Sequence, residues 1–253
     1  MQSAAAGHKM GRRALRSGRP ARPTETRRMH RHGGSQIVMP QESRPPATDR
    51  THGFYAEHVV PRLVNLTCAA KTADPLRRRV CAGLVGSVVE IGFGSGLNVP
   101  HYPAAVTTVA AVEPSDVAWK LAAGRVQGTR VHVERSALDA QDLSYRDNSF
   151  DGAVSTWSLC TIGDPVAALT ELRRVLKPGG RFHFVEHGLA PDEEVRRWQR
   201  RLEPLQKRIF GGCHLTRSVI ELPNSTGFVV RERDVVHEEG SPNSAVPLFW
   251  VLP

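Results

Sequence analysis

Three glycines alternate with other residues directly after an apolar run, in the segment Val88-Val89-Glu90-Ile91-Gly92-Phe93-Gly94-Ser95-Gly96. The apolar run predicts a buried β-strand that turns toward a helix at the first glycine. Glycine has no Cβ, so the backbone amides of such a turn can approach a ligand at the N-terminus of the following helix. The segment therefore predicts a nucleoside site at the carboxyl end of this strand, lined by Gly92, Phe93, Gly94 and Gly96.

The spacing of the glycines separates two kinds of nucleoside ligand. A dinucleotide-binding turn of the G-x-G-x-x-G type needs a glycine at position 97, but Leu97 stands there and the third glycine is Gly96. Glu90 adds a carboxylate that would repel a pyrophosphate but could hold an ammonium group, directly or through water. S-adenosylmethionine carries that ammonium group and no phosphate, so the segment favours this cofactor. A nicotinamide-dependent oxidoreductase is the alternative.

A second carboxylate closes the next predicted strand. The β-branched run from Val106 to Val112 ends in Glu113, which lies 21 residues after Gly92. An acid at this distance, at the tip of the second strand, accepts hydrogen bonds from both ribose hydroxyls of a bound nucleoside. Pro114 follows and opens a helix. A surface glutamate is the simpler alternative, but a lone acid at the end of an apolar strand favours the ligand-binding interpretation.

Further candidates follow the third and fourth predicted strands. The third strand, 130–134, is followed by Asp139 and Ala140, where a carboxylate could accept a hydrogen bond from an adenine amino group. The fourth strand leaves through Thr156 and Trp157, which are predicted to face the same crevice. The indole of Trp157 would form a wall of the acceptor site or part of the core.

The predicted strands alternate with helices, which indicates an α/β fold. Asp164-Pro165 predicts a helix start, because a capping carboxylate precedes a proline at the first helical position. That helix stops before Pro178-Gly179-Gly180, and a fifth strand follows. We therefore expect an open, Rossmann-like parallel sheet with helices on both faces and a ligand crevice along its carboxyl edge.

Two amphipathic segments are predicted to lie outside this core. Residues 54–66 predict two short helices, broken near Pro61 and Pro75, that cover the cofactor or only pack. Residues 192–210 predict a helix with one apolar and one cationic face, kinked or divided at Pro204. For this second segment a lid over the substrate ranks first, and peripheral contact with an anionic membrane surface ranks second.

The positive charge of the chain is concentrated at one end. Of the formal net charge of +9, residues 1–50 carry 11 basic and 3 acidic side chains, whereas residues 51–253 carry 23 and 22. Residues 1–50 are rich in Arg, Pro, Gly and Ser, which predicts a disordered basic tail before a single domain at 51–253. A nucleic-acid-binding tail is an alternative, but no aromatic residues are interleaved to stack on bases.

The cysteine spacing predicts reduced thiols and a cytoplasmic location. The four cysteines form no CxxC pair and no zinc-ligand spacing. The turn Gly211-Gly-Cys-His-Leu-Thr-Arg217 carries a thiol, an imidazole and a guanidinium, but the sequence shows no further ligands close by, so no metal site is predicted. No apolar run approaches the roughly 18 residues that are needed to cross a bilayer. The cysteines are Cys68, Cys81, Cys160 and Cys213.

Several motifs in this order resemble class I S-adenosylmethionine-dependent methyltransferases, in particular the small-molecule branch typified by ubiquinone and menaquinone biosynthesis enzymes. Val185-Glu186-His187 followed by Gly211 to Arg217 is similar to the alkyl-thiol methyltransferase-like subgroup. The resemblance implies a seven-stranded sheet with an antiparallel last strand and cofactor contacts at Glu90, Gly92, Gly94, Gly96, Glu113 and Asp139. The motifs are Glu90 to Gly96, Glu113, Asp147-Asn-Ser-Phe-Asp151 and Arg174-Val-Leu-Lys-Pro-Gly-Gly180.

Methyl transfer from a sulfonium is an in-line displacement with a good leaving group, so alignment and exclusion of water can supply most of the catalysis. For a phenol, thiol or amine acceptor, a neutral imidazole could remove the acceptor proton near neutral pH. His187 and His214 are the candidate bases, and each could instead be structural. Arg217 could hold an acidic substrate group or pair with a carboxylate. The sequence leaves open the acceptor (a thiol, a quinol or phenol, or a lipid-like molecule) and the oligomeric state.

Overall fold

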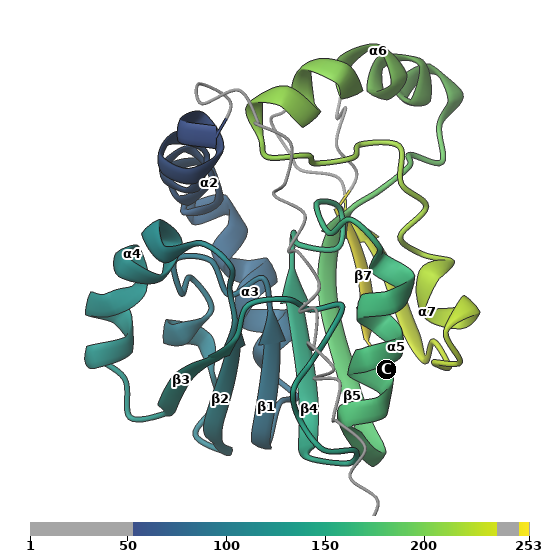
Figure 1. Cartoon of the computed structure of the whole chain (residues 1–253). Helices are drawn as coiled ribbons and strands as arrows, with labels where there is room; N and C mark the ends of the chain where they lie inside the picture. Colours follow the sequence, from purple (N-terminus) through teal and green to yellow (C-terminus); the bar gives the residue numbers. More distant parts are fainter. Residues whose placement is uncertain (1–52, 237–247, 253) are drawn as a thin grey trace, which may run out of the picture. The chain divides into compact units, whose positions relative to one another are not determined.

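The computed structural model describes residues 53–236 and 248–252, with β6 and β7 described by their backbone (Figure 1). The predicted tail lies outside the described residues, and the domain boundary near residue 50 stays a prediction. Five parallel strands stand in the order β3-β2-β1-β4-β5. This order confirms the predicted α/β class with a parallel sheet. The strands are β1 (Gly86–Ile91), β2 (Val106–Val112), β3 (His132–Ala137), β4 (Phe150–Thr156) and β5 (Leu176–His187).

The central strands β1 and β4 are buried on both faces of the sheet, and their successive residues point to opposite sides. Val88 and Val154 pack into one apolar cluster with residues of α3 and α4. Their neighbours Val89 and Ala153 pack into a second cluster with residues of α5 on the other face. The predicted cover of helices on both faces is confirmed (Figure 1). The helices are α3 (Asp74–Cys81), α4 (Asp116–Gln127) and α5 (Pro165–Val175).

The sheet continues past β5 with the backbone of two more strands. β7 (Leu248–Leu252) pairs antiparallel with β5 and with β6 (Glu232–Val236). The four-residue helix α7 (Leu222–Ser225) precedes β6 and contains Pro223. Residues 237–247 lie outside the described chain, so the complete seven-stranded sheet stays a prediction.

The first described helical segment is continuous where a break was predicted. A π-helical stretch, Tyr55–Val59, passes directly into α2 (Val60–Cys68). Pro61 is in the first turn of α2, at the change of helical geometry, where a missing amide donor is tolerated. The second predicted break is confirmed, because Pro75 lies in the first turn of α3 after a short 3-10 turn at Lys71–Ala73.

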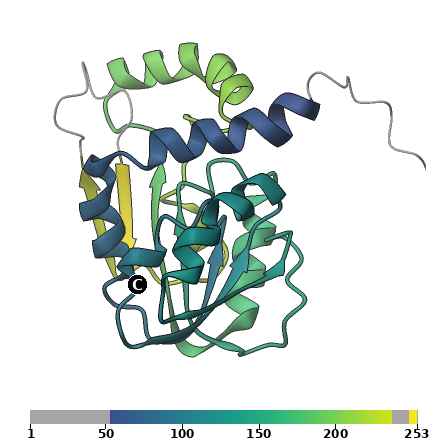
Figure 2. The same cartoon turned by 90° about the vertical axis from the view of Figure 1, so that its left-hand side faces the viewer.

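Two helices lie beyond the carboxyl ends of the parallel strands, and Figures 1 and 2 both show them above the sheet. They are α2 and α6 (Glu193–Ile209), which runs through Pro204 as one helix. Tyr55, just before α2, donates a side-chain hydrogen bond to the carbonyl of Ile209 at 3.3 Å. No helix among residues 53–236 and 248–252 is long and apolar enough to cross a membrane.

Candidate functional site

The glycine segment forms a tight loop after β1. Gly92, Gly94 and Gly96 all have positive φ, at 66°, 59° and 74°. This left-handed region is unfavourable for residues with a Cβ, so each position favours glycine. The helix predicted after the loop is present only as a 3-10 turn, Val99–His101, because prolines in and after it remove amide donors.

The glycines differ in what surrounds them. A Cβ at Gly92 would lie 1.9 Å from the hydroxyl oxygen of Ser158, so this position closes against the end of β4. A Cβ at Gly94 would meet only the carbonyl oxygen of Gly92, at 3.8 Å. Gly94 therefore presents open backbone, which a loop that holds a nucleoside requires. Phe93 is buried and packs against Trp119, with ring centroids 5.5 Å apart, so it supports the loop from the core.

Glu113 lies next to this loop, as predicted. It follows β2, and its carboxylate accepts hydrogen bonds from the amides of Gly94 and Ser115, both at 2.7 Å. Glu113 is 6% exposed, and burial raises the pKa of its carboxyl above the ordinary value. The carbonyl of Pro114 accepts a hydrogen bond from Arg135 at 3.1 Å, which fixes the start of α4. Glu113 thus places carboxylate oxygens beside the open face of Gly94.

Glu90 is the acidic residue within β1, and its side chain is buried under the same loop. Its carboxylate accepts hydrogen bonds from Asn98, at 2.9 Å, and from the hydroxyl of Tyr102. Desolvation raises the pKa of Glu90 to about 7, and the negative charge of Glu113 adds to this rise. The charges of the two carboxylates therefore interact across the glycine loop. The structure does not place them on opposite sides of the sheet, an arrangement that would have excluded a shared ligand.

Arg77, from α3, was not predicted to belong to this region. It is 4% exposed, and its guanidinium donates hydrogen bonds to Asn98 at 2.9 Å and to Thr156 at 3.2 Å. The same guanidinium lies 4.6 Å from the centre of the Trp157 ring. No local pattern distinguishes Arg77, since it stands among three consecutive arginines on an otherwise ordinary helix. It connects the loop after β1 with the end of β4.

Trp157 has a backbone conformation that bulky residues rarely adopt. Its φ is 52°, and its buried indole nitrogen has no hydrogen-bond partner among the described residues. Backbone strain of this kind costs of order 1–3 kcal/mol and concentrates at functional sites. The indole also lies 6.2 Å from the ring of His187. The predicted role of Trp157 as a wall of the acceptor site stays a prediction, and the strained backbone supports it.

A buried carboxylate, Glu186 in β5, shapes the turn that follows Trp157. It accepts hydrogen bonds from the amides of Ser158, Leu159 and Cys160, at 2.6, 2.8 and 3.3 Å, and from the hydroxyl of Ser155 at 3.0 Å. Burial raises the pKa of Glu186 despite these donors. The motif that contains Glu186 was noticed in the sequence, but its role depends on contacts between two strands and could not be predicted.

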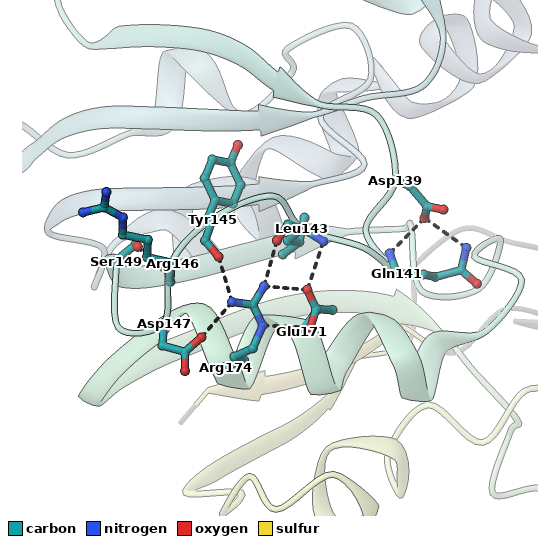
Figure 3. A network of polar contacts seen from close by, with 9 residues as sticks. All are labelled: Asp139, Gln141, Leu143, Tyr145, Arg146, Asp147, Ser149, Glu171 and Arg174. Atoms are coloured by element: carbon teal, nitrogen blue, oxygen red, sulfur yellow. Dashed lines mark hydrogen bonds and ion pairs between the residues drawn. The ribbon is translucent and has the colours of Figure 1, made fainter. Parts of the chain in front are cut away.

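The loop that carries Asp139 is held by Arg174 (Figure 3). Arg174 donates to the carbonyls of Leu143 and Tyr145, both at 2.7 Å, and pairs with Asp147 and Glu171. Two motifs of the expected family, around Asp147 and Arg174, therefore contact each other and fix this loop against α5.

Asp139 itself is exposed, and one of its carboxylate oxygens accepts both hydrogen bonds from Gln141, at 2.9 and 3.0 Å. These bonds lower the pKa of Asp139. Ala140 is buried against the α5 face of the sheet. The expected contact of Asp139 with an adenine amino group stays a prediction. The other carboxylate oxygen accepts no hydrogen bond from a described residue.

The two candidate bases lie in different surroundings. His187 ends β5, is half-buried, and has Nδ1 3.9 Å from the sulfur of Cys160. His214 has Nδ1 3.4 Å from a carboxylate oxygen of Glu203 in α6, and burial together with Arg217 and Lys207 lowers its pKa. His187 is the better placed of the two, because it also contacts Trp157.

Arg217 makes structural contacts with the backbone of the turn after β4. Its guanidinium donates to the carbonyls of Leu159 and of Ile162, the latter at 2.7 Å. Its predicted role as a substrate anchor stays a prediction, and these contacts show that it already braces the turn after β4.

The buried face of α6 differs from the predicted one. Its apolar residues Trp198, Leu202 and Leu205 are 49%, 40% and 56% exposed. Polar residues face the protein instead: Gln199 bonds the backbone of Gly188 and Ala190, and Glu203 bonds Thr216. The predicted amphipathic helix is confirmed, but hydrogen bonds of Gln199 and Glu203 hold its inner side, where Val195 and Ile209 are half-buried.

The chain matches a known family over the core of the fold. Residues 89–184 match the family described as "Methyltransferase domain". The match begins in β1 and ends in β5, so it includes the glycine loop, Glu113 and the turn after β4.

Curated relatives match about half of the chain. Thiol S-methyltransferase TMT1B from Rattus norvegicus is 37% identical over 135 residues, which cover 52% of this chain and 55% of the relative. Demethylmenaquinone methyltransferase from Clavibacter sepedonicus is 32% identical over 120 residues, which cover 47% of this chain and 49% of the relative. The chain therefore spans about half the length of the curated relatives that it matches.

Solved structures share the fold at low sequence identity. An S-adenosylmethionine-dependent methyltransferase from Mesorhizobium loti has a TM-score of 0.54 at 18% identity, covering 72% of this chain and 98% of that chain. This similarity shows the fold alone.

Proposed function

We propose that this chain, whose residues 89–184 match the family described as "Methyltransferase domain", transfers a methyl group from S-adenosylmethionine to a small-molecule acceptor. The observation that carries the proposal is the pairing of two buried carboxylates, Glu90 and Glu113, around the open glycine loop. A phosphate-bearing dinucleotide would be repelled there. An adenosyl sulfonium with an ammonium group is attracted.

Each residue has a distinct part in this proposal. Glu113 would accept the ribose hydroxyls, and the open backbone of Gly94 would let the nucleoside approach. Glu90 would hold the ammonium group, because its carboxylate lies under the loop at the end of β1. When bound, the cofactor supplies a methyl group on a sulfonium, a good leaving group. The remaining task of the protein is to align the acceptor and to exclude water.

Fixed groups at the ends of β4 and β5 support this alignment. Arg77 and Trp157 stack against each other, and Glu186 fixes the turn that follows. His187 lies beside Trp157 and would accept the proton of a thiol or phenol acceptor. We assign the base to His187 rather than to His214, whose imidazole faces Glu203.

A thiol is the acceptor class that we place first. The support is the printed name of a relative, a thiol S-methyltransferase, and the position of His187. A quinol is the second class, supported by the demethylmenaquinone methyltransferase relative.

The test is an assay of the full chain with labelled methyl donor against a panel of thiols, quinols, phenols and lipid head groups, with titration of S-adenosylhomocysteine. We expect label in an acceptor, and binding of S-adenosylhomocysteine in preference to NAD. Glu113→Ala should weaken this binding by about 10- to 100-fold, the effect of a lost hydrogen bond to a charged group. Glu134→Ala, an exposed acid on β3, is the matched control. Preferential NAD binding would contradict the proposal.

We also propose that α6 contacts an anionic membrane surface that presents apolar acceptors. The support is the exposed apolar stripe of α6 together with the arginines beside it, one of which, Arg201, lies over the Trp198 ring.

The seven-stranded sheet completed by β7 and β6, the cytoplasmic location and the disordered tail stay predictions. Comparing nucleic-acid binding by the full chain and by a chain that lacks residues 1–50 would test whether the tail binds nucleic acid.

A further inference from the structure

Three potential metal ligands from separate parts of the chain meet at the ends of β4 and β5. Cys160 lies in the turn after β4, His187 ends β5, and Cys213 follows α6. Their ligand atoms all lie within 4.8 Å of one another. The sulfurs of Cys160 and Cys213 are 3.6 Å apart, and the sulfur of Cys160 is 3.9 Å from Nδ1 of His187. The sequence showed no such cluster, because the residues are 27 and 53 positions from Cys160.

These separations suit a tetrahedral metal ion. With Zn–S bonds of about 2.3 Å and Zn–N bonds of about 2.0 Å, tetrahedral angles place two sulfurs about 3.8 Å apart and a sulfur and a nitrogen about 3.5 Å apart. The Cys160–Cys213 and Cys160–His187 separations differ from these by a few tenths of an ångström, and the ligand atoms of Cys213 and His187 lie within 4.8 Å of each other. Both cysteines are free thiols, and a disulfide would need the sulfurs at about 2.05 Å.

Hydrogen bonds that do not involve the ligand atoms hold the cluster together. The amide of His214 donates to the carbonyl of Cys160 at 2.9 Å, so Cys213 is fixed beside Cys160. Arg217 binds the carbonyls of Leu159 and Ile162, on both sides of Cys160. A site whose ligands are already positioned binds its metal with little ordering cost.

We propose that Cys160, His187 and Cys213 bind a zinc ion through two thiolates and one imidazole, and that its fourth coordination position takes an external thiolate. Sulfur and imidazole ligands select thiophilic metals such as zinc, and a three-ligand site leaves one position open. Cys160 and Cys213 are buried whereas His187 is half-buried beside Trp157, so the approach to the open position is on the His187 side.

The second part of this inference rests on the proposed function, because the external thiolate would be the methyl acceptor. The acceptor thiol would lose its proton on binding zinc, first to solvent. Its sulfur would then attack the methyl carbon, so that a carbon–sulfur bond forms while the bond from the methyl carbon to the sulfonium breaks. The products are a thioether and neutral S-adenosylhomocysteine. Because His187 would be a zinc ligand, its imidazole could not also take the proton, so zinc would replace the base role assigned to His187 above.

Metal binding is tested on the full chain with Co²⁺ as a spectroscopic substitute for zinc. We expect one Co²⁺ per chain, with tetrahedral ligand-field bands and sulfur-to-cobalt charge transfer, and displacement by Zn²⁺. Cys160→Ser and Cys213→Ser should weaken binding at least tenfold. Cys68→Ser, which removes a half-buried thiol in α2, should bind as the unchanged protein does. Far-ultraviolet circular dichroism and S-adenosylhomocysteine titration show whether each variant folds.

A replacement ligand separates coordination from a structural role. His187→Cys should retain Co²⁺ and increase the charge-transfer band by roughly half, because three thiolates replace two. Absence of Co²⁺ and Zn²⁺ binding by the unchanged protein, equal binding by Cys213→Ser, or a Cys160–Cys213 disulfide under mild reductant would each overturn the metal site.

The open position is tested without any methyl transfer. Addition of mercaptoethanol to the Co²⁺ form should raise the charge-transfer band, and an unchanged spectrum would overturn the open position. In the methyl-transfer assay, removal of zinc should lower kcat/KM for a thiol at least tenfold while S-adenosylhomocysteine affinity stays the same, and added zinc should restore it. Full thiol activity without zinc would overturn the acceptor role. Because the cobalt spectra need no turnover, they decide the metal site even if no acceptor is methylated.

Discussion

The guanidinium of Arg77 lies 4.6 Å from the centre of the Trp157 ring. This cation–π contact joins two parts of the site that are 80 residues apart in the chain. Arg77 also binds Asn98, which in turn binds Glu90. One buried side chain therefore relates the carboxylate under the glycine loop to the strained residue at the end of β4.

Glu90→Gln is expected to change the pH dependence of stability. The pKa of Glu90 is about 7 in the folded protein and near 4.5 ordinarily, so between these values the folded state binds more protons than the unfolded state. The free energy of unfolding should therefore fall as pH rises from about 4.5 to about 7, by about 3 kcal/mol. Glu90→Gln should lack this fall, as measured by denaturant unfolding at several pH values. Glu134→Gln is the control, and an unchanged profile in Glu90→Gln would contradict the assignment.

The same substitution should weaken cofactor binding. An ammonium group is held by the ionised carboxylate, so the affinity for S-adenosylhomocysteine should rise from pH 6 to pH 8 in the unchanged protein. Glu90→Gln should bind about tenfold or more weakly at pH 8 and show little dependence on pH. Calorimetric titration measures both. Equal affinity of the two proteins at pH 8 would remove Glu90 from the cofactor site.

Gly94→Ala and Gly92→Ala should separate binding from stability. Both positions have positive φ, so each substitution costs about 1 kcal/mol of backbone strain. At Gly92 the Cβ also collides with Ser158, so the larger loss of stability is expected there. At Gly94 the Cβ enters open space on the ligand side, so the main effect should be loss of S-adenosylhomocysteine affinity. Thermal unfolding and titration measure the two effects.

Gly124→Ala serves as the control for this pair. It lies in α4 with nothing within 4 Å of its Cβ position, so we expect a gain of about 0.5–1 kcal/mol and unchanged binding. If Gly94→Ala bound S-adenosylhomocysteine as tightly as Gly124→Ala, the open face of the loop would not be the nucleoside side.

Glu186→Gln should destabilise the protein by about 2–4 kcal/mol. The carboxylate accepts three backbone amides and one hydroxyl, and an amide side chain would place a donor against these donors in a buried site. Denaturant unfolding measures the loss, and Glu194→Gln on the exposed side of α6 should change little. A loss below 1 kcal/mol would show that the turn after Trp157 is held by other contacts.

Leu205→Glu is expected to reduce binding to anionic vesicles. The side chain is 56% exposed on the apolar stripe of α6, and a carboxylate there both removes apolar area and opposes the surface charge. Cosedimentation with phosphatidylserine-containing vesicles at low salt should show weaker binding by several-fold. Leu138→Glu makes the same change at another exposed leucine and should bind as the unchanged protein does. Equal loss in both variants would indicate a general charge effect.

The sequence by itself determined the parallel α/β core and the position of the glycine loop between two carboxylates. Local signals were sufficient for this, since apolar periodicity, capping residues such as Asp164 and the glycine spacing act within a few residues along the chain. The π-helical start of α2 was not predicted, because the proline there lies in a first helical turn, where it is tolerated. The 3-10 geometry after the loop was not predicted either, although prolines there limit the helix to one short turn.

Only the tertiary structure decided what distant residues do together. Arg77 joins the site through packing of α3 on the sheet, Glu186 acts through a neighbouring strand, and the exposed stripe of α6 follows from polar contacts of Gln199 on its other side. Cys160 and Cys213 look like isolated thiols in the sequence and lie 3.6 Å apart in the fold. Contacts of this kind depend on which distant segments the fold brings together at the carboxyl edge of the sheet, and no local sequence pattern predicts this.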